Sequence, residues 1–237
     1  MDQFSRTRML LGSEGVERLR QSTVAVFGVG GVGGYVAEAL ARSGVGALTL
    51  VDNDTVSLTN LNRQIIALHS TVGQLKTEVM ATRIRDINPA CEVEPLAMFY
   101  LPENADSIDL GRFDYVVDAI DTVAAKLELA ERCYRRGIPE IAALGAGNKL
   151  DPSKLLISDI GKTHTCPLAR VMRLECRRRG IERLKVAWST EPAMTPLETE
   201  EESSRRSLPG STAFVPSAMG LMIAAEVVRD LITTETE

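Results

Sequence analysis

The feature that most constrains the fold is a glycine-rich turn between a short strand and a helix. Residues 23–27 have the composition of a buried β-strand, and Gly28-Val-Gly-Gly-Val-Gly33 follows directly and leads into helical periodicity at 35–42. Glycines here let the backbone turn sharply and approach a phosphate, whose charge the exposed N–H groups of the helix start can bind. The pattern predicts a nucleotide-binding α/β fold. The glycines expected at the nucleotide are Gly28, Gly30, Gly31 and Gly33.

Strands and helices alternate along the chain after this turn. Apolar runs predict further strands at 48–51, 92–96, 115–117 and 141–144. Helical periodicity predicts helices at 75–87, 103–110 and 124–136. Beyond residue 147 the pattern is less regular, and it indicates strands at 155–159 and 185–188 with helices at 167–179 and from 217. Strict alternation predicts a Rossmann-like, mostly parallel, doubly wound sheet with helices on both faces.

The chain is expected to form a single domain, because no linker or internal repeat divides its 237 residues. Residues 22–147 would form the nucleotide-binding half and residues 148–237 the substrate and interface half. The segment 191–202 carries five glutamates and two prolines, so a mobile crossing loop is expected there. Residues 234–237 should form a frayed tail.

A soluble protein of the cytoplasm is expected from the remaining composition. The N-terminus is too charged for a signal peptide, and the charge-free run 207–225 is interrupted by Pro209 and Pro216, which favours a loop and a buried helix over a membrane span. The four cysteines form no CxxC pair, so reduced thiols are predicted.

Charged residues near the turn favour a ligand more highly charged than a nicotinamide dinucleotide. Asp52 ends the second strand, where a carboxylate can accept hydrogen bonds from ribose hydroxyls. The following loop and helix supply Arg63 and Lys76, whose side chains suit phosphate oxygens. A dehydrogenase and a ligand-free tight turn are therefore both disfavoured.

Two carboxylates, Asp118 and Asp121, follow the strand at 115–117 and should lie at the carboxyl edge of the sheet. A carboxylate beside a triphosphate is a natural ligand of Mg²⁺, which prefers one or two carboxylates together with phosphate oxygens. Cations, a metal carboxylate and a glycine turn together predict ATP chemistry without a P-loop.

These residues resemble a known family. The segments GVGGVG, VDND, TNLNRQ, QLKTEVM and VVDAID are similar to the ATP-binding signature of the ubiquitin-activating-enzyme-like (ThiF/MoeB/HesA-type) adenylyltransferases. The segments NPACEV, GAGNKLDPS, CPLARVMR and FVPSAMGLMIAAEVV make the chain most similar to the tRNA threonylcarbamoyladenosine dehydratase branch. That branch uses ATP to adenylate the threonyl carboxylate of a modified adenosine in tRNA, which then cyclises with loss of water, releasing AMP and pyrophosphate.

The resemblance implies roles for individual residues. Asp52 matches the acid that binds the ribose, Asn60 and Arg63 match residues that contact the phosphates, and Lys76 matches the lysine near the β- and γ-phosphates. Asp121 matches the Mg²⁺ carboxylate. The expected nucleotide contacts also include Asp54, Gln64 and Asp118.

The resemblance also implies partners. Arg6, with Arg8 as a rival, is similar to an arginine that reaches into the neighbouring subunit's site, so a homodimer is expected. The RNA-borne substrate is tRNA carrying threonylcarbamoyladenosine, and a sulfur-transfer accessory protein is a further possible partner.

An alternative is adenylation of the C-terminus of a ubiquitin-like sulfur-carrier protein. Such activators commonly place a reactive cysteine on the crossing loop and often hold zinc with paired CxxC motifs, whereas this chain has no cysteine after Cys176. His164, Cys166 and Cys176 match no common metal site. The cysteine pattern therefore favours the RNA-borne carboxylate. A non-catalytic nucleotide sensor is a third class, which the charged residues disfavour.

A basic helix face is a candidate RNA contact. In the helix predicted at 167–179, Leu168, Val171, Met172 and Cys176 fall on one side, and the opposite side carries Arg170, Arg173 and Arg177. A protein of net charge −5 must concentrate its bases to bind RNA. A merely solvated helix face is an equal alternative.

Overall fold

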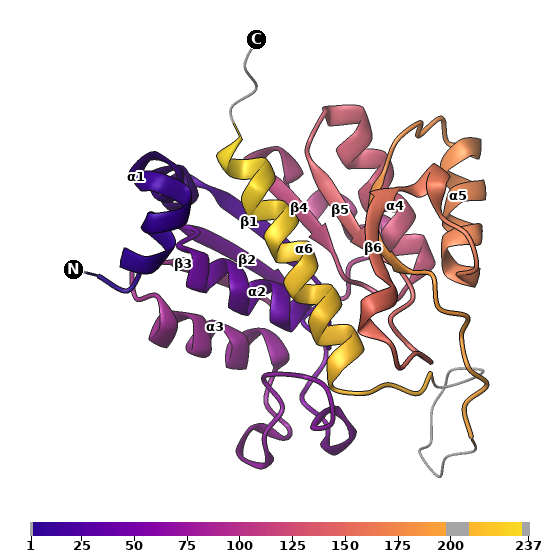
Figure 1. The fold of residues 1–237 in the computed structure, drawn as a ribbon, viewed down its shortest axis with the longest axis horizontal. Coiled ribbons are helices and arrows are strands. Elements are labelled where there is room, and N and C mark those ends of the chain that lie inside the picture. Colours follow the sequence, from indigo (N-terminus) through magenta and orange to yellow (C-terminus); the bar gives the residue numbers. More distant parts are fainter. Residues whose placement is uncertain (1, 198–208, 234–237) are drawn as a thin grey trace.

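The computed structural model describes residues 2–197 and 209–233. Within these ranges seven strands form one sheet in the order β3-β2-β1-β4-β5-β7-β6 (Figure 1). The strands are β1 (Thr23–Phe27), β2 (Ala47–Val51), β3 (Glu92–Leu96), β4 (Tyr115–Asp118), β5 (Glu140–Ala143), β6 (Leu155–Asp159) and β7 (Lys185–Ser189). Each neighbouring pair is parallel except β6 and β7, which are antiparallel. The predicted mostly parallel, doubly wound fold is confirmed.

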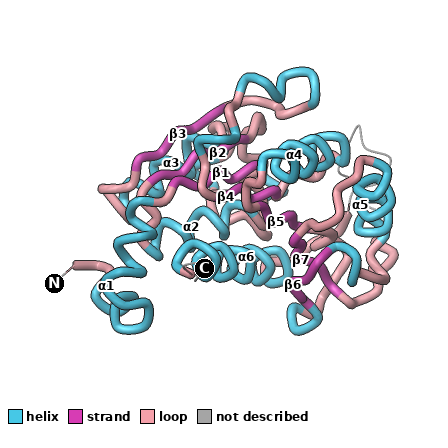
Figure 2. The backbone as a smooth tube through the Cα atoms, turned by 90° about the horizontal axis from the view of Figure 1, so that it is seen from above, coloured by secondary structure: helices cyan, strands magenta, loops and turns pink. Residues whose placement is uncertain are grey.

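Helices cover both faces of this sheet, as Figure 2 shows from above. The helices are α1 (Ser5–Gln21), α2 (Gly33–Ser43), α3 (Lys76–Ile87), α4 (Val123–Arg136), α5 (Pro167–Arg178) and α6 (Phe214–Ile232). Apolar side chains of α1, α2, α3 and α6 share one core with the sheet, whereas α4 and α5 contribute to two cores on the other face. Burial of Val24, Val26, Val116 and Val117 at 0% exposure shows that the central strands are covered on both sides, which explains their continuous apolar runs.

Two elements differ from the sequence prediction. Helix α1 was not expected; it buries only Gly15, Val16 and Leu19 near its end and is kinked at Gly12, so its first half lacks an apolar stripe that periodicity could detect. The helix expected at 103–110 is instead two 3₁₀ segments, Pro102–Ser107 and Leu110–Arg112. In the first of these, the Asn104 side chain accepts a hydrogen bond from the Leu101 N–H and stabilises a tight turn.

Some expected features fall outside the described residues. Residues 198–202 of the expected crossing loop and the tail at 234–237 both lie there. The described part of the crossing segment includes Glu191, whose carboxylate accepts hydrogen bonds from backbone N–H groups, so the expected mobile loop is anchored at this residue. None of the described helices combines the length and apolar character needed to cross a bilayer.

Candidate active site

A cleft of about 440 Å³ opens at the carboxyl ends of the central strands. The connections after β1, β2 and β4 line it, together with residues after β5 and before α6. The loops that follow β2 project from the lower edge of the sheet in Figure 1. Parallel α/β sheets bind their ligands at this edge, so the cleft is the candidate active site. It contains most of the residues expected from the sequence. Those residues are Gly28, Gly30, Gly31, Asp52, Asp54, Asn60, Arg63, Gln64, Lys76 and Asp121.

The glycine turn needs glycine at two positions for steric reasons. Gly28 has φ +87°, and a Cβ there would lie 2.6 Å from the Ala119 carbonyl oxygen. A Cβ on Gly33 would lie 1.8 Å from the Gly28 carbonyl oxygen. Gly33 therefore does not line the cleft but lets α2 start directly against the end of β1. The start of α2 faces the cleft and can receive a phosphate.

Asp52 is held by backbone N–H groups at the end of β2. Its Oδ2 accepts a hydrogen bond from Val29 N at 2.7 Å, and its Oδ1 accepts one from Asp54 N at 2.8 Å. Each carboxylate oxygen retains a second lone pair. The side chain is fixed in place beside the glycine turn and can still accept from a ribose hydroxyl.

The cationic side of the cleft is formed by Lys76 and Arg63. Lys76 is the first residue of α3 and only 6% exposed, and its Nζ lies 2.7 Å from Asp54 Oδ2. The Arg63 guanidinium donates hydrogen bonds to the Thr59 carbonyl and to Asn62 Oδ1. The buried Lys76 ammonium must bind an anion, and a phosphate group that enters the cleft can replace the more exposed Asp54 carboxylate.

Asn60 and Gln64 shape the loop that carries Arg63. Asn60 Oδ1 accepts a hydrogen bond from Ser57 N at 3.1 Å, and its backbone carbonyl accepts from Arg63 N and Gln64 N. Gln64 is 7% exposed, and its buried Oε1 has no hydrogen-bond partner within the described residues. Asn60 thus contributes to loop geometry as well as to the cleft wall.

Asp121 lies on the turn after β4 and is exposed to the cleft. The turn is held from below by Asp118 and Lys126, which are both 0% exposed. Lys126 Nζ donates to the Ile120 carbonyl at 3.1 Å and lies 3.0 Å from Asp118 Oδ2, while Ile120 N donates to Asp118 Oδ1 at 3.1 Å. Asp118, expected at the nucleotide, is thus buried outside the cleft lining and supports the turn instead. Sequence reasoning missed Lys126, since a lysine in a helix normally faces solvent.

The donor set fits a magnesium ion. Asp121 and Asp54 are both exposed residues and line the same cleft as Lys76 and Arg63. Oxygen donors of this kind, in small number and beside a phosphate site, match what Mg²⁺ requires. Asp121 is the residue that would hold it.

A third acidic residue lies close beneath this turn. Burial raises the pKa of Glu140 in β5 well above its ordinary value, and the nearby Asp118 charge raises it further, while Lys126 acts in the opposite direction. Glu140 Oε1 is buried without a hydrogen-bond partner among the described residues. Burial without a hydrogen-bond partner favours the neutral form of Glu140, which leaves Lys126 to balance the Asp118 charge.

The candidate base side of the cleft was not anticipated from the sequence. Met98, Phe99 and Tyr100 follow β3 and line the cleft together with Ala119 and Ile120. Tyr100 packs edge-on against Phe27 with ring centroids 4.9 Å apart. An apolar and aromatic lining suits the flat face of a purine. No turn glycine or charge marks this segment, so the sequence offered no signal for it.

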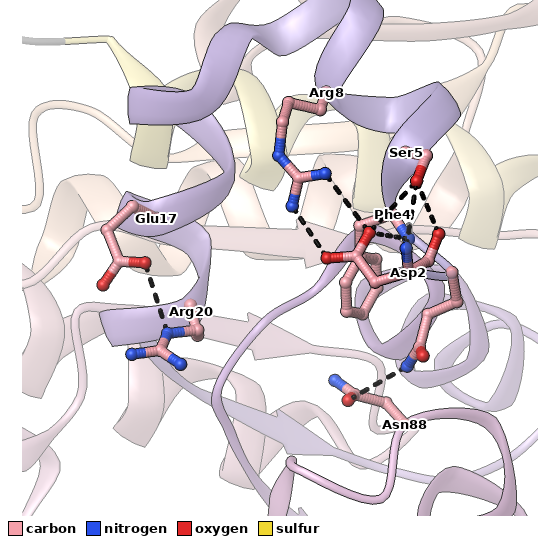
Figure 3. Close-up of polar contacts among 8 residues, drawn as sticks. Asp2, Phe4, Ser5, Arg8, Glu17, Arg20 and Asn88 are labelled. Carbon is pink, nitrogen blue, oxygen red and sulfur yellow. Dashed lines mark hydrogen bonds and ion pairs between the residues drawn. The ribbon is translucent and has the colours of Figure 1, made fainter.

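Arg6 and Arg8 lie far from this cleft, at the amino edge of the sheet. Gln3, next to α1, donates to the Ile87 carbonyl and to Asn88 Oδ1, just before β3. Arg8 forms a bidentate contact with Asp2 at 2.9 and 3.2 Å (Figure 3), whereas Arg6 is exposed and makes no such contact in the described part of the chain. Neither arginine can serve the cleft of its own subunit.

The basic face of α5 is smaller than the sequence indicated. Arg173 donates from Nη1 to the Thr163 carbonyl and to Thr163 Oγ1, at 2.8 and 2.6 Å, so it has a structural role. Arg170 and Arg177 are exposed. The expected apolar side is wrong at Val171, which is 45% exposed; Ala169 is buried in its place beside Met172 and Cys176.

All four cysteines are buried as free thiols. Burial raises the pKa of Cys91 and of Cys176 to about 11 and raises the pKa of Cys133 further still. Cys166 is 3% exposed and lies against Gly145. Protonated, inaccessible thiols are poor nucleophiles, which agrees with a site that works without a cysteine.

Comparisons with known proteins agree with this geometry. The model of the ThiF family matches residues 4–237. A tRNA threonylcarbamoyladenosine dehydratase of Bacillus subtilis (strain 168) is 48% identical over 98% of this chain and 95% of the relative. A tRNA threonylcarbamoyladenosine dehydratase of Haemophilus influenzae is 37% identical over 97% of this chain and 93% of the relative. The solved structure of the Escherichia coli tRNA N6-threonylcarbamoyladenosine dehydratase in complex with AMP has a TM-score of 0.89 at 35% identity, covering 97% of this chain and 94% of that one. The complex of that enzyme with ATP has a TM-score of 0.86 at 34% identity.

Proposed function

The chain belongs to the ThiF family, and on that premise we propose that it is an ATP-dependent tRNA threonylcarbamoyladenosine dehydratase. The enzyme adenylates the threonyl carboxylate of the modified nucleoside and then closes a ring, with AMP and pyrophosphate as products. The observation that carries the proposal is that the glycine turn, Lys76 and Asp121 meet in one cleft. Near full-length similarity to relatives of that activity supports the choice of substrate.

The reaction requires the protein mainly to position the substrate carboxylate and ATP and to stabilise the charge on the phosphates. A carboxylate oxygen of the substrate bonds to the α-phosphorus of ATP, and the bond to the β-phosphate breaks. Lys76 and Arg63 stabilise the charge on the phosphate oxygens and on the departing pyrophosphate, and the start of α2 receives the α-phosphate. A magnesium ion held by Asp121 would neutralise part of the triphosphate charge.

Ring closure needs no nucleophile from the protein. The carbamoyl group of the same side chain attacks the activated acyl carbon, loses a proton and expels AMP, so that the nucleoside loses one water overall. Such an intramolecular attack has a high effective molarity. The burial of all four cysteines supports this route over a thioester with a sulfur-carrier protein.

Mass spectrometry of nucleosides tests the proposal. Modified tRNA incubated with the protein and ATP should yield a nucleoside lighter by one water, and tRNA that lacks the threonylcarbamoyl group should give no such product. ATP turnover that requires a small ubiquitin-like protein instead of tRNA would contradict the proposal.

We further propose that the protein acts as a homodimer in the cytoplasm and that Arg6 serves the partner's cleft. The cleft of the subunit that carries Arg6 lies at the opposite edge of the sheet from this arginine. Arg8, the rival candidate, donates hydrogen bonds to Asp2. Met9 and Leu10, which follow Arg6 on α1, are 83% and 87% exposed, as expected of an interface. A sulfur-transfer accessory protein is a further proposed partner, on the family resemblance alone.

Subunit mixing tests the role of Arg6. Arg6→Ala and Lys76→Ala subunits, each inactive alone, should regain activity when mixed, because a mixed dimer contains one intact composite site. Lack of recovery despite demonstrated subunit exchange would contradict an arginine supplied in trans.

A further inference from the structure

The segment GAGNKLDPS, Gly145 to Ser153, has no role in the mechanism above, although it adjoins the cleft. It follows β5 and lies against the two ends of the crossing segment that links β7 to α6. Asn148, with φ +58°, is one of two non-glycine residues with positive φ in the described ranges; the other is Thr165. Asparagine tolerates this conformation better than most residues, but it still needs support from its surroundings.

Asn148 bonds both ends of the crossing segment. Its backbone N–H donates to the Gly210 carbonyl at 2.7 Å, and its side-chain Oδ1 accepts from Gly210 N at 2.6 Å. Its carbonyl accepts from Met194 N at 2.8 Å. Asn148 therefore joins the outgoing end of the segment, which follows β7, to the returning end, which precedes α6. We name this set of three hydrogen bonds the Asn148 clasp.

The returning end of the segment forms a wall of the cleft. Pro209 and Ser211 line the cleft together with Gly147. A Cβ on Gly147 would lie 2.8 Å from Pro209 Cβ, so the two backbones are packed in direct contact. On the other side of the wall, Asn62 Nδ2 donates to the Ser211 carbonyl at 3.0 Å. The wall of residues 209–211 is thus held between the clasp and the loop that carries Arg63.

The outgoing end has a second anchor beside the clasp. Leu150 N donates to both carboxylate oxygens of Glu191, at 3.0 and 3.2 Å, and Asp151 N donates to one of them at 3.0 Å. Lys149, only 3% exposed, donates from Nζ to the Glu191 carbonyl at 2.8 Å. Each of residues 148–151 therefore donates at least one hydrogen bond to the crossing segment.

The wall lies beside the residues expected to bind the phosphates. Ser211 is bonded to the Arg63 loop, and Pro216, shortly after the wall, lies next to Gly31 of the glycine turn. The base side is formed by Met98, Phe99 and Tyr100. A carboxylate that attacks the α-phosphorus must approach from the phosphate side, so the wall borders its path.

We propose that Asn148 is a positioning residue that fixes the wall 209–211 so that the threonyl carboxylate is aligned with the α-phosphorus. The inference rests on the proposed function. Misplacement of a reacting group by about 1 Å can cost about 10²-fold in rate, so a single clasp can have a large kinetic effect.

The test compares three variants of the full-length protein. Asn148→Gly accepts the positive φ but removes the Oδ1 acceptor, Asn148→Asp keeps an acceptor at the same place, and Thr165→Gly is the matched control at the other residue of positive φ. The readouts are hydrogen exchange of the Gly210 amide, the dissociation constant for ATP, and kcat/KM for modified tRNA. Melting temperatures confirm that all variants fold.

In Asn148→Gly the Gly210 amide should exchange about 10-fold faster or more, because its acceptor is gone. The kcat/KM for modified tRNA should fall about 10-fold or more, while ATP affinity stays within about 2-fold of the wild type. In Asn148→Asp the Gly210 exchange rate and the kcat/KM for modified tRNA should both be close to those of the wild type. Thr165→Gly should match the wild type in the same two quantities.

Unchanged Gly210 exchange in Asn148→Gly would overturn the clasp itself. Unchanged kcat/KM despite faster exchange would overturn its positioning role. Equal losses of kcat/KM in Thr165→Gly would also overturn that role, since they would show a general effect of removing a residue with positive φ. A wild-type protein that forms no AMP with modified tRNA would instead refute the proposed function, and the Gly210 exchange would still decide whether the clasp exists.

Discussion

Lys126 Nζ lies 3.0 Å from Asp118 Oδ2, and both side chains are fully buried beneath the turn that carries Asp121. The lysine also donates to the Ile120 carbonyl. Because two charges are buried together, each is stable only in the presence of the other. This pair links the stability of the fold to the position of the candidate metal carboxylate.

Lys126→Met should destabilise the protein by about 3–5 kcal/mol, because it leaves the Asp118 carboxylate buried without its partner. Urea unfolding measures the loss. Arg135→Met on the same helix is the matched control. The Arg135 side chain is 70% exposed, and its partner Glu131 keeps a second ion pair with Arg179, so the loss should cost about 1 kcal/mol or less. Similar losses in the two variants would contradict the buried pair.

Glu140→Gln should flatten the dependence of stability on pH. The folded state raises the Glu140 pKa above 4.5, so the folded protein holds this proton more tightly than the unfolded chain. The resulting stabilisation is complete below pH 4.5 and is lost as the pH rises toward the folded-state pKa. Wild-type stability should therefore decline more than that of the variant between pH 5 and pH 8, as measured by unfolding at a series of pH values. Parallel curves would show that Glu140 is not held protonated.

The sequence predicted the architecture well because its strongest signals are local. The glycine turn, the acidic residues Asp52 and Asp121 that follow strands, and the alternation of strands and helices each depend on residues close together in the chain. The clasp at Asn148, the buried Lys126 and the base side at Met98 depend on contacts between distant segments. The residue types of Asp118 and Arg173 predicted ligand contacts. In the fold, however, Asp118 pairs with Lys126 and Arg173 donates to Thr163, and neither contact can be read from the sequence.

Lys76→Ala, Arg63→Ala and Asp121→Asn should each lower AMP formation about 10²-fold or more, which is the usual cost of removing one preorganised charged group. Arg85→Ala, on the same helix as Lys76 but outside the cleft lining, is the control and should retain wild-type rates. Near-normal turnover in all three cleft variants would mean that the phosphate site lies elsewhere.

The double change Arg170→Glu and Arg177→Glu should weaken tRNA binding while ATP affinity stays nearly constant. Two potential phosphate contacts are lost, so the plot of the log of the binding constant against the log of the salt concentration should be less steep by about 2. Arg173 is left intact because Thr163 holds it. A double reversal of Arg20 and Arg85, on α1 and α3, controls for the change in net charge. Coincident binding curves at low salt would show that the α5 face is only solvated.

The most direct test of the adenylation mechanism follows the carboxylate oxygens of the substrate. With both oxygens of the threonyl carboxylate labelled with ¹⁸O, attack on the α-phosphorus leaves one labelled oxygen on the phosphate when ring closure expels AMP. Mass spectrometry should therefore find one ¹⁸O in AMP and one AMP formed for each nucleoside that loses water. Unlabelled AMP, or release of ADP and phosphate in its place, would contradict the account.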